Sequence, residues 1–210
     1  MKSLTILYED DLCLVIDKPA GLAVQGGAGV KISLDQILKE KYQAPFLVHR
    51  LDKDTSGVIL TAKTKEAAAC FSRIFGGNTG IKKQYITVCA GRFSCDEGII
   101  NHDLEIKGNV KKAVTKYKAV NSGKIEAGEL TCEYSVLKLE LGTGRMHQIR
   151  KHLAMNGTPV LGDDKYGDFS LNKKLRKAIG LKRLLLHASR LVISEYKIDV
   201  SAPLPAYFQY

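Results

Sequence analysis

The chain has 210 residues and a mass of 23.1 kDa, which suits one domain with an ample hydrophobic core. Its 32 Lys and Arg residues against 22 Asp and Glu give a formal net charge of +10, which favours an anionic partner, nucleic acid first and an acidic membrane surface second. No apolar run reaches membrane-spanning length and the start Met1-Lys2-Ser3-Leu4 carries no signal-peptide core, so we expect a soluble cytoplasmic protein.

The first third of the chain is expected to contain short strands and one capped helix. Alternating or apolar residues predict four strands, at residues 4–8, 12–16, 46–48 and 58–60. The first two strands form a hairpin that leads into a turn at residues 17–21, where Pro and Gly bend the chain. Ser33 and Gln36 have the spacing of a capping box and predict a short helix that runs toward Tyr42.

The polar loop at residues 49–57 reads His-Arg-Leu-Asp-Lys-Asp-Thr-Ser-Gly and lies between two of these strands. It places two carboxylates, Asp52 and Asp54, beside two cations, Arg50 and Lys53. Many clusters of such turn-forming residues are plain surface turns. Here the apolar strands tether both ends of the loop to a core, so the loop is suited to hold a reactive acid.

Two metal-dependent chemistries compete for this loop. A calcium-binding loop fits the spacing of its carboxylates and hydroxyls, but its twelfth residue is Lys63 where calcium requires a bidentate Glu. Magnesium-dependent phosphoryl transfer through an aspartyl-phosphate fits Asp52 and Asp54, with Asp163 and Asp164 as further ligands. The flanking cations oppose it, because magnesium sites are rich in carboxylates and face phosphates.

After the loop, Thr64 can cap an alanine-rich helix that ends at Gly76 and Gly77. Alternating or β-branched residues then predict three strands, at residues 84–90, 113–120 and 133–141. Five cysteines without a Cys-x-x-Cys pair predict reduced thiols that serve packing. No histidine spacing matches a zinc site.

A second charged segment, residues 144–153, has helical spacing. Met146, Ile149 and Leu153 form an apolar stripe, and Arg150 lies at the edge of the same face. A guanidinium turned inward requires a carboxylate partner, and Asp52 is a candidate. Such a pair would keep Asp52 ionised and hold its direction. The alternative is a partly exposed Arg150 whose stem covers apolar surface while its head reaches water.

Together these segments resemble the signature motifs of the RluA-type pseudouridine synthases, and the similarity runs from about Tyr8 to Pro205. The blocks that carry it are residues 17–21, 49–57, 81–85, 144–152, 160–163 with 166–167, and 185–188. Met146 stands where relatives usually have Thr, which changes only a local contact. Many relatives carry an N-terminal S4-like RNA-binding domain, whereas the similarity here begins at about Tyr8, so we expect a form without that domain.

The resemblance implies an α+β fold with a mixed, mainly antiparallel sheet flanked by helices and a central cleft, in a single domain over residues 1–210. It implies isomerisation of uridine to pseudouridine in RNA without a metal or organic cofactor. Asp52 matches the catalytic aspartate and Arg150 the arginine that pairs with it. Tyr85 matches the tyrosine that stacks on the target base, Arg50 the arginine that fills the space the base leaves, and Leu186 an apolar side of the base pocket.

The expected partner is RNA, as a tRNA or rRNA stem-loop, and the protein is expected to act as a monomer without an obligate protein partner. Two groups of basic residues are candidates for phosphate contact or for a solvated face: Lys107, Lys111, Lys112, Lys116 and Lys118, and Lys173, Lys174, Arg176, Lys177, Lys182 and Arg183. The alternative function is a catalytically silent RNA-binding module of the same fold.

Overall fold

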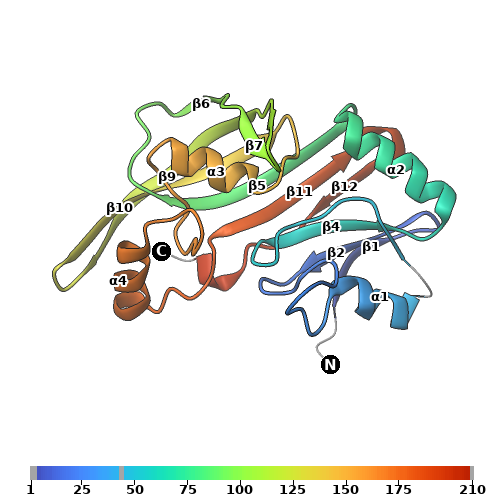
Figure 1. Ribbon diagram of the computed structural model, residues 1–210, viewed down its shortest axis with the longest axis horizontal. Coiled ribbons are helices and arrows are strands. Elements are labelled where there is room, and N and C mark those ends of the chain that lie inside the picture. The colour runs from blue at the N-terminus through green and yellow to red at the C-terminus, as the bar shows by residue number, and fades with distance from the viewer. Residues whose placement is uncertain (1–3, 43–44, 209–210) are drawn as a thin grey trace. The chain divides into compact units, whose positions relative to one another are not determined.

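The alternating residues at the start of the chain form the predicted hairpin in the computed structural model, which describes residues 4–42 and 45–208 (Figure 1). Strands β1 (Thr5–Glu9) and β2 (Cys13–Lys18) are antiparallel. Asp10 closes their turn, because its carboxylate accepts hydrogen bonds from the backbone N–H groups of Leu12 and Cys13 at 2.8 and 2.7 Å. Residues 1–3, part of the start examined for a signal peptide, lie outside the described residues.

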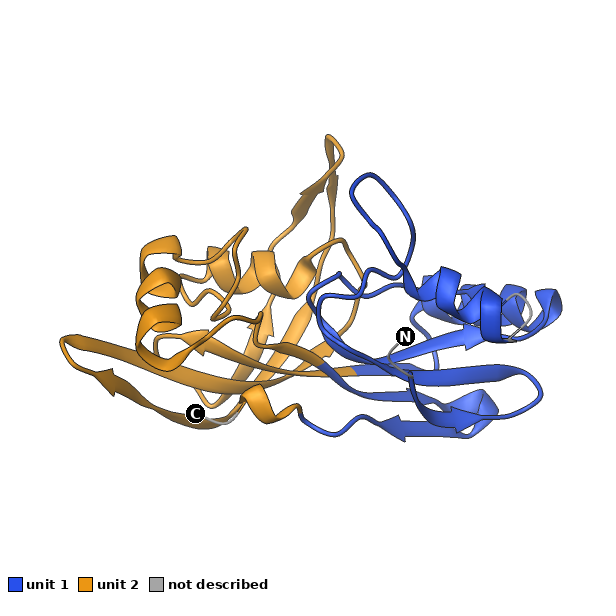
Figure 2. Cartoon of the chain, turned by 90° about the horizontal axis from the view of Figure 1, so that it is seen from below, with its two compact units in different colours: residues 1–83, 188–204 blue, residues 84–187, 205–210 orange. Residues whose placement is uncertain are grey.

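Two compact units divide the chain (Figure 2). The first unit comprises residues 1–83 and 188–204, and the second comprises residues 84–187 and 205–210. The boundaries fall inside strands β5 (Ile81–Ala90) and β11 (Leu186–Ile193). A single domain over the whole chain stays a prediction, since one domain can comprise more than one compact unit.

The sheet of the first unit is built around β4 (Ser56–Ala62), which is buried along its whole length. β2 pairs with β4 in antiparallel register, and so does the two-residue strand β3 (Phe46–Leu47). β12 (Ile198–Ser201) pairs with β11 and follows a single 3₁₀ turn at Ser194–Tyr196. The predicted strand at residues 46–48 was one residue too long, and β12 was not predicted.

Both predicted helices of the first unit are present with their caps. α1 (Leu34–Tyr42) begins with the capping box, in which Gln36 accepts from the N–H of Ser33 at 2.9 Å. α2 (Lys65–Gly77) begins at Thr64, whose hydroxyl accepts from the N–H of Ala67 at 3.1 Å. Its apolar face packs on β2, β4 and β12 in a core that includes Val15, Leu60, Phe71, Ile193 and Ile198.

The second unit contains an antiparallel sheet in the order β5-β10-β9-β6. β9 (Thr115–Ala127) and β10 (Leu130–Leu141) form a long hairpin, so both strands extend further than predicted. β6 (Glu97–Ile100) and the separate two-stranded sheet of β7 (Leu104–Ile106) and β8 (Asn109–Lys111) were not predicted, because they are short and largely exposed.

Helix α3 (Gln148–Met155) lies against the sheet of the second unit (Figure 1). Ile149 and Leu153 are buried among Leu137 and Leu139 of β10, as the apolar stripe predicted. The prediction was wrong for Met146, which precedes the helix and is 48% exposed. His147, in the left-handed conformation at φ 54°, turns the chain into the helix after it.

Helix α4 (Phe169–Ile179) completes the second unit, with a last 3₁₀ turn at Ala206–Phe208. The α+β class with a mixed, mainly antiparallel sheet and flanking helices is therefore confirmed. No helix in the described part of the chain is long and apolar enough to cross a membrane. All five cysteines are free thiols, and burial raises the pKa of Cys13 and of Cys89 to about 12, so both stay protonated packing residues.

Gly57 of β4 is a position that only glycine can occupy. Its φ is +107°, and a Cβ there would lie 2.1 Å from the backbone oxygen of Ala188. Gly57→Ala is expected to lower the free energy of unfolding by at least about 3 kcal/mol in urea denaturation. Gly76→Ala in α2 is the control, since nothing lies within 4 Å of its Cβ and Ala favours a helix. Equal stability of the two variants would contradict the close approach.

Candidate functional site

Asp52 lies in a tight turn between a buried anchor and a buried strand. Leu51 before it is 5% exposed, and Thr55 and Ser56 after it are 2% exposed, so both ends of the turn are fixed in the first unit. The N–H of Thr55 donates to the backbone oxygen of Asp52 at 3.2 Å and closes the turn. Asp52 is half-buried while Arg50 is exposed. The acid is thus held on a short, well-anchored segment.

The buried side chain of Lys18 fixes this turn through a hydrogen bond to its backbone. This side chain is fully buried, and its ammonium donates to three backbone oxygens, those of Pro19, Leu22 and Lys53, at 3.1, 2.9 and 3.0 Å. Burial lowers the pKa of Lys18 to about 8, and the nearby carboxylates of Asp54 and Asp52 oppose that shift. A buried ammonium requires such acceptors, so Lys18 ties the Asp52 turn to the turn at residues 19–22.

His49 is a structural member of the loop. Its ring stacks on Phe75 of α2 with centroids 4.0 Å apart, and its Nε2 accepts from the N–H of Leu60 at 3.0 Å. The ring is therefore neutral with its proton on Nδ1. Burial, aided by the positive charge of Lys83, lowers the pKa of His49 to about 3. The histidine fixes the start of the loop to β4 and α2.

Arg150 is turned inward, the first of the two alternatives that the sequence left open, and in the second unit its side chain pairs with the carboxylate of Asp163. The guanidinium donates through Nε and Nη2 to both oxygens of Asp163, at 2.8 and 2.7 Å. The two side chains are 10% and 1% exposed. Such a bidentate pair fixes the plane of the guanidinium as well as its position. The partner named from the sequence was Asp52, and that pairing stays a prediction.

The Asp163 carboxylate is itself held in place. Burial raises the pKa of Asp163, but the hydrogen bonds from Arg150 and from the backbone N–H groups of Tyr166 and Lys165 outweigh burial and keep that pKa below its usual range. The aromatic ring of Tyr166 lies 5.2 Å from the guanidinium carbon of Arg150, a cation–π distance. The Tyr166 hydroxyl is 2.8 Å from Nδ1 of His147. Arg150 is thus clamped on one edge and one face.

Tyr85 and Leu186 lie in one hydrophobic cluster of the second unit. Tyr85 is half-buried on β5 opposite Leu139 of β10, and Leu186 at the start of β11 is 3% exposed. Ile149, the neighbour of Arg150 on α3, belongs to the same cluster. An aromatic ring and an aliphatic side chain therefore share a cluster with the helix that carries Arg150, and such side chains are suited to contact a flat base.

The structure brings the predicted residues together in two sets. Arg50 and Asp52 share one loop of the first unit, and Tyr85, Arg150 and Leu186 share one region of the second. The sequence reading assigned no role to Lys18 and only metal binding to Asp163, although both lie in its motif blocks. One physical rule could have pointed to both residues, because a cation turned inward requires hydrogen-bond acceptors nearby. Sequence alone does not say which acceptors these are.

Comparison with known proteins shows which family the chain is similar to. The model of a family described as RNA pseudouridylate synthase matches residues 12–155. The ribosomal large subunit pseudouridine synthase C of Rickettsia bellii is 36% identical, with 97% of this chain and 69% of that protein covered. The tRNA pseudouridine synthase C of Haemophilus ducreyi is 33% identical, with 98% and 93% covered. Human RNA pseudouridylate synthase domain containing 4 is 25% identical with a TM-score of 0.79, over 97% of this chain and 90% of that one.

The depressed pKa of His49 makes stability pH-dependent. Between pH 6.5 and about 3 the unfolded chain binds a proton that the folded chain does not, so stability is full above pH 6.5 and falls as the pH is lowered. From pH 7 to pH 5 this loss is about 2 kcal/mol. In urea denaturation at pH 7 and pH 5, the free energy of unfolding of His49→Gln is expected to fall by about 2 kcal/mol less than that of the unmutated protein. His102→Gln, which replaces an exposed histidine, is the control and is expected to keep the pH dependence of the unmutated protein.

Breaking the Arg150 clamp is expected to be costly. Asp163→Asn leaves a buried guanidinium without its counter-charge and is expected to lower the free energy of unfolding by about 3–5 kcal/mol. Asp199→Asn is the matched control, because Asp199 also pairs with an arginine through two hydrogen bonds but both side chains are about half exposed. Its expected cost is below about 1 kcal/mol. Thermal and urea denaturation measure both variants, and similar losses of stability in the two would contradict the idea that the buried pair matters more than the exposed one.

Proposed function

Since this chain belongs to the RNA pseudouridylate synthase family, an enzyme family that isomerises uridine in RNA, we propose that it forms pseudouridine in a structured RNA with Asp52 as its nucleophile. The bond from C1′ of the ribose to N1 of uracil breaks, and C1′ rejoins the ring at C5. N1 gains a proton and C5 loses one, so the reaction needs no oxidant or reductant. The observation that carries the proposal is the anchored Asp52 turn.

Asp52 suits each of three routes: attack on C1′, addition to C6, or removal of the 2′ proton. All three require an ionised carboxylate that holds one direction while the base rotates. The turn closed by Thr55 and the ammonium of Lys18 on the oxygen of Lys53 support that role, because they fix the backbone at the acid and directly after it. A fixed acid lowers the barrier by holding reactants in a reactive geometry.

Arg150 is proposed as the cation that orients Asp52. The pair with Asp163 uses Nε and Nη2, and a guanidinium has five N–H donors in total, so one arginine can bind two carboxylates at once. A preorganised guanidinium holds a carboxylate more effectively than a mobile lysine does. The meeting of Asp52 and Arg150 in a central cleft belongs to this proposal.

The base-binding roles follow from the family and from side-chain chemistry. Tyr85 is proposed to stack on the target base, worth roughly 1–3 kcal/mol, while Leu186 lines the apolar side of the pocket. Their shared hydrophobic cluster supports this arrangement. Arg50 is exposed two residues before Asp52, so it is free to enter the RNA stack and fill the space that the extruded base leaves.

The substrate is proposed to be a tRNA or rRNA stem-loop. The most similar proteins described above include one named for the ribosomal large subunit and one named for tRNA, so both RNA classes are candidates. The enzyme is further proposed to act in the cytoplasm as a monomer, within a single domain and without a metal or organic cofactor. The net charge of +10 supports an RNA partner.

The decisive change is Asp52→Asn, which removes the nucleophile and keeps the size of the side chain. It is expected to abolish tritium release from 5-tritiated uridine in RNA while leaving folding and RNA affinity largely intact. Asp54→Asn, two residues later on the exposed side of the same turn, is the matched control and is expected to retain activity. Assays with separate tRNA and rRNA fractions in EDTA identify the substrate class.

Each other outcome has a definite meaning. Normal turnover by Asp52→Asn would falsify the role of that residue. Folded, RNA-binding protein that releases no tritium from either fraction would favour the catalytically silent binding module. Full tritium release in EDTA would exclude magnesium-dependent phosphoryl transfer as the chemistry of the loop.

A further inference from the structure

Helix α4 presents a strongly basic surface that the catalytic site does not use. Four of its residues turn inward: Asn172 and Leu175 are buried, and Leu171 and Ile179 are partly buried, whereas Phe169 at its start is exposed. Asp168 caps its start, and Gly180 ends it in the left-handed conformation. The helix is therefore stabilised by its buried face and its caps, which leaves its cations free for another task.

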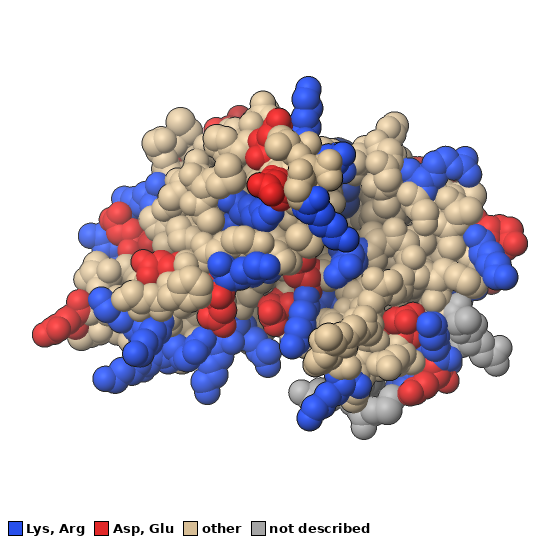
Figure 3. All heavy atoms as spheres, in the orientation of Figure 1, with Lys and Arg blue, Asp and Glu red and all other residues tan. Residues whose placement is uncertain are grey.

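The outward face of α4 is rich in cations and carries no carboxylate. Residues 169–183 contain six Lys and Arg and no Asp or Glu, against a net charge of +10 for the whole chain. The four cations within the helix are all exposed: Lys173, Lys174, Arg176 and Lys177. Figure 3 shows Lys and Arg side chains gathered along the part of the second unit where α4 lies in Figure 1. We call these four residues the α4 basic face.

Little of this charge is neutralised within the protein. Arg176 lies 3.4 Å from Asp164, and both side chains are more than half exposed, so that pair is weak. Among the described residues, no carboxylate lies within ion-pair distance of Lys173, Lys174 or Lys177. Adjacent like charges destabilise a helix. Their concentration here is explained if an external anion binds them.

The helix is also rigidly attached to the Arg150 clamp. The Asn172 side chain accepts from the N–H of Gly162 at 2.9 Å and donates to the backbone oxygen of Asp163 at 3.0 Å. Gly162 allows this close packing, because a Cβ there would lie 2.1 Å from the oxygen of Arg183. The α4 basic face thus has a fixed position relative to Arg150 within the second unit.

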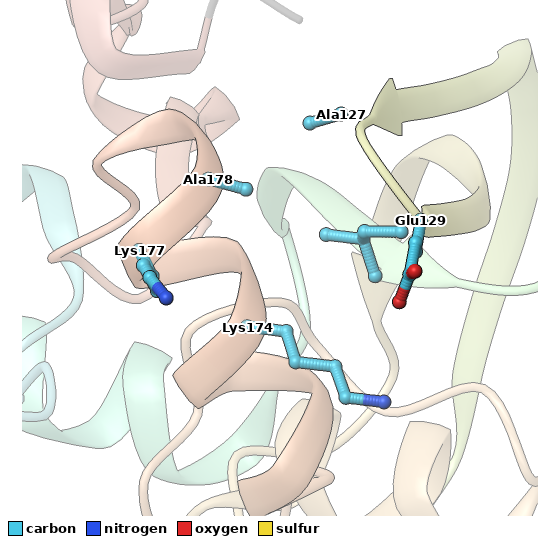
Figure 4. Close-up of a pocket in the computed structure, with 6 residues that line it drawn as sticks. Ala127, Glu129, Lys174, Lys177 and Ala178 are labelled. Atoms are coloured by element: carbon cyan, nitrogen blue, oxygen red, sulfur yellow. The ribbon is translucent and has the colours of Figure 1, made fainter.

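An open pocket of about 460 Å³ lies between α4 and the tip of the β9–β10 hairpin (Figure 4). Lys174, Lys177 and Ala178 line it from the helix, and Ala127, Glu129 and Leu130 line it from the hairpin. Glu129 places a carboxylate in that wall, which opposes deep entry of a phosphate. The pocket is therefore better read as the edge of a surface than as a separate anion site.

We propose that the α4 basic face binds the phosphate backbone of the substrate RNA beside the modified uridine. Cations three and four residues apart on a helix lie about 5–6 Å apart and form a row that can follow successive phosphates. This inference rests on the proposed function, and it adds the surface that holds the RNA. A membrane surface fits less well, because Leu171, Leu175 and Ile179 pack in the protein core, which leaves Phe169 as the one large apolar side chain of α4 that is exposed.

The test is the fourfold variant K173Q/K174Q/R176Q/K177Q, with binding of substrate RNA measured between 50 and 300 mM salt. Loss of four phosphate contacts is expected to reduce the slope of log K against log salt by about 3–4. KM for RNA is expected to rise at least about tenfold while kcat at saturating RNA is unchanged, because the variant touches no catalytic group.

The matched control is K39Q/K41Q/K65Q/R73Q, which removes the same charge from exposed cations on α1 and α2. It is expected to keep the salt slope and KM of the unmutated protein. If both variants change the salt slope and KM equally, the effect comes from overall charge and the proposal of a local surface is wrong. If the α4 variant keeps both values, the proposal is also overturned. In both cases tritium release by the unmutated protein would still stand, so failure of this inference is distinct from failure of the proposed function.

Discussion

The cost of taking a cation out of water organises both units of this protein. A buried ammonium or guanidinium is tolerated only where acceptors surround it. In the first unit Lys18 meets three backbone oxygens, and one of them belongs to the turn that carries Asp52. In the second unit Arg150 meets both oxygens of Asp163. In each case the acceptors are loop atoms, so satisfying the cation also fixes a loop.

The two cations suit their different tasks. The compact ammonium of Lys18 lies at the centre of converging carbonyl groups, where three donors can point in three directions. The planar guanidinium of Arg150 is held along one edge by a carboxylate and on one face by Tyr166, which sets its orientation. A fixed turn for the acid and a fixed plane for the arginine are what a reaction with a rotating base demands, since misplaced groups lose much of their effect.

Cations on the surface follow another rule. The α4 basic face is exposed, nearly free of internal ion pairs and attached through Asn172 to the loop that holds Arg150. Charge that destabilises an isolated helix becomes useful when a polyanion is the substrate, because each neutralised phosphate releases counterions. Positive charge in this chain is thus divided between buried groups that position loops and exposed groups suited to hold RNA. The family membership and the charge distribution agree.

The sequence by itself determined what depends on near neighbours. The hairpin turn at Asp10, the caps at Ser33 and Thr64, the buried strand after Asp52 and the family motifs all follow from residues a few positions apart. For Arg150 the sequence left an inward and a partly exposed side chain open, and the structure shows the inward one. Only the tertiary structure decided which acceptors meet the buried cations, because Lys18 and Lys53 are 35 residues apart and the sequence suggested only Asp52 for Arg150, not Asp163. The strands β6, β7, β8 and β12 were missed because each has only three or four residues, too few for a clear alternating pattern. Met146 was wrongly placed on a helix, because the left-handed conformation of His147 starts α3 after it and spacing alone does not show that conformation.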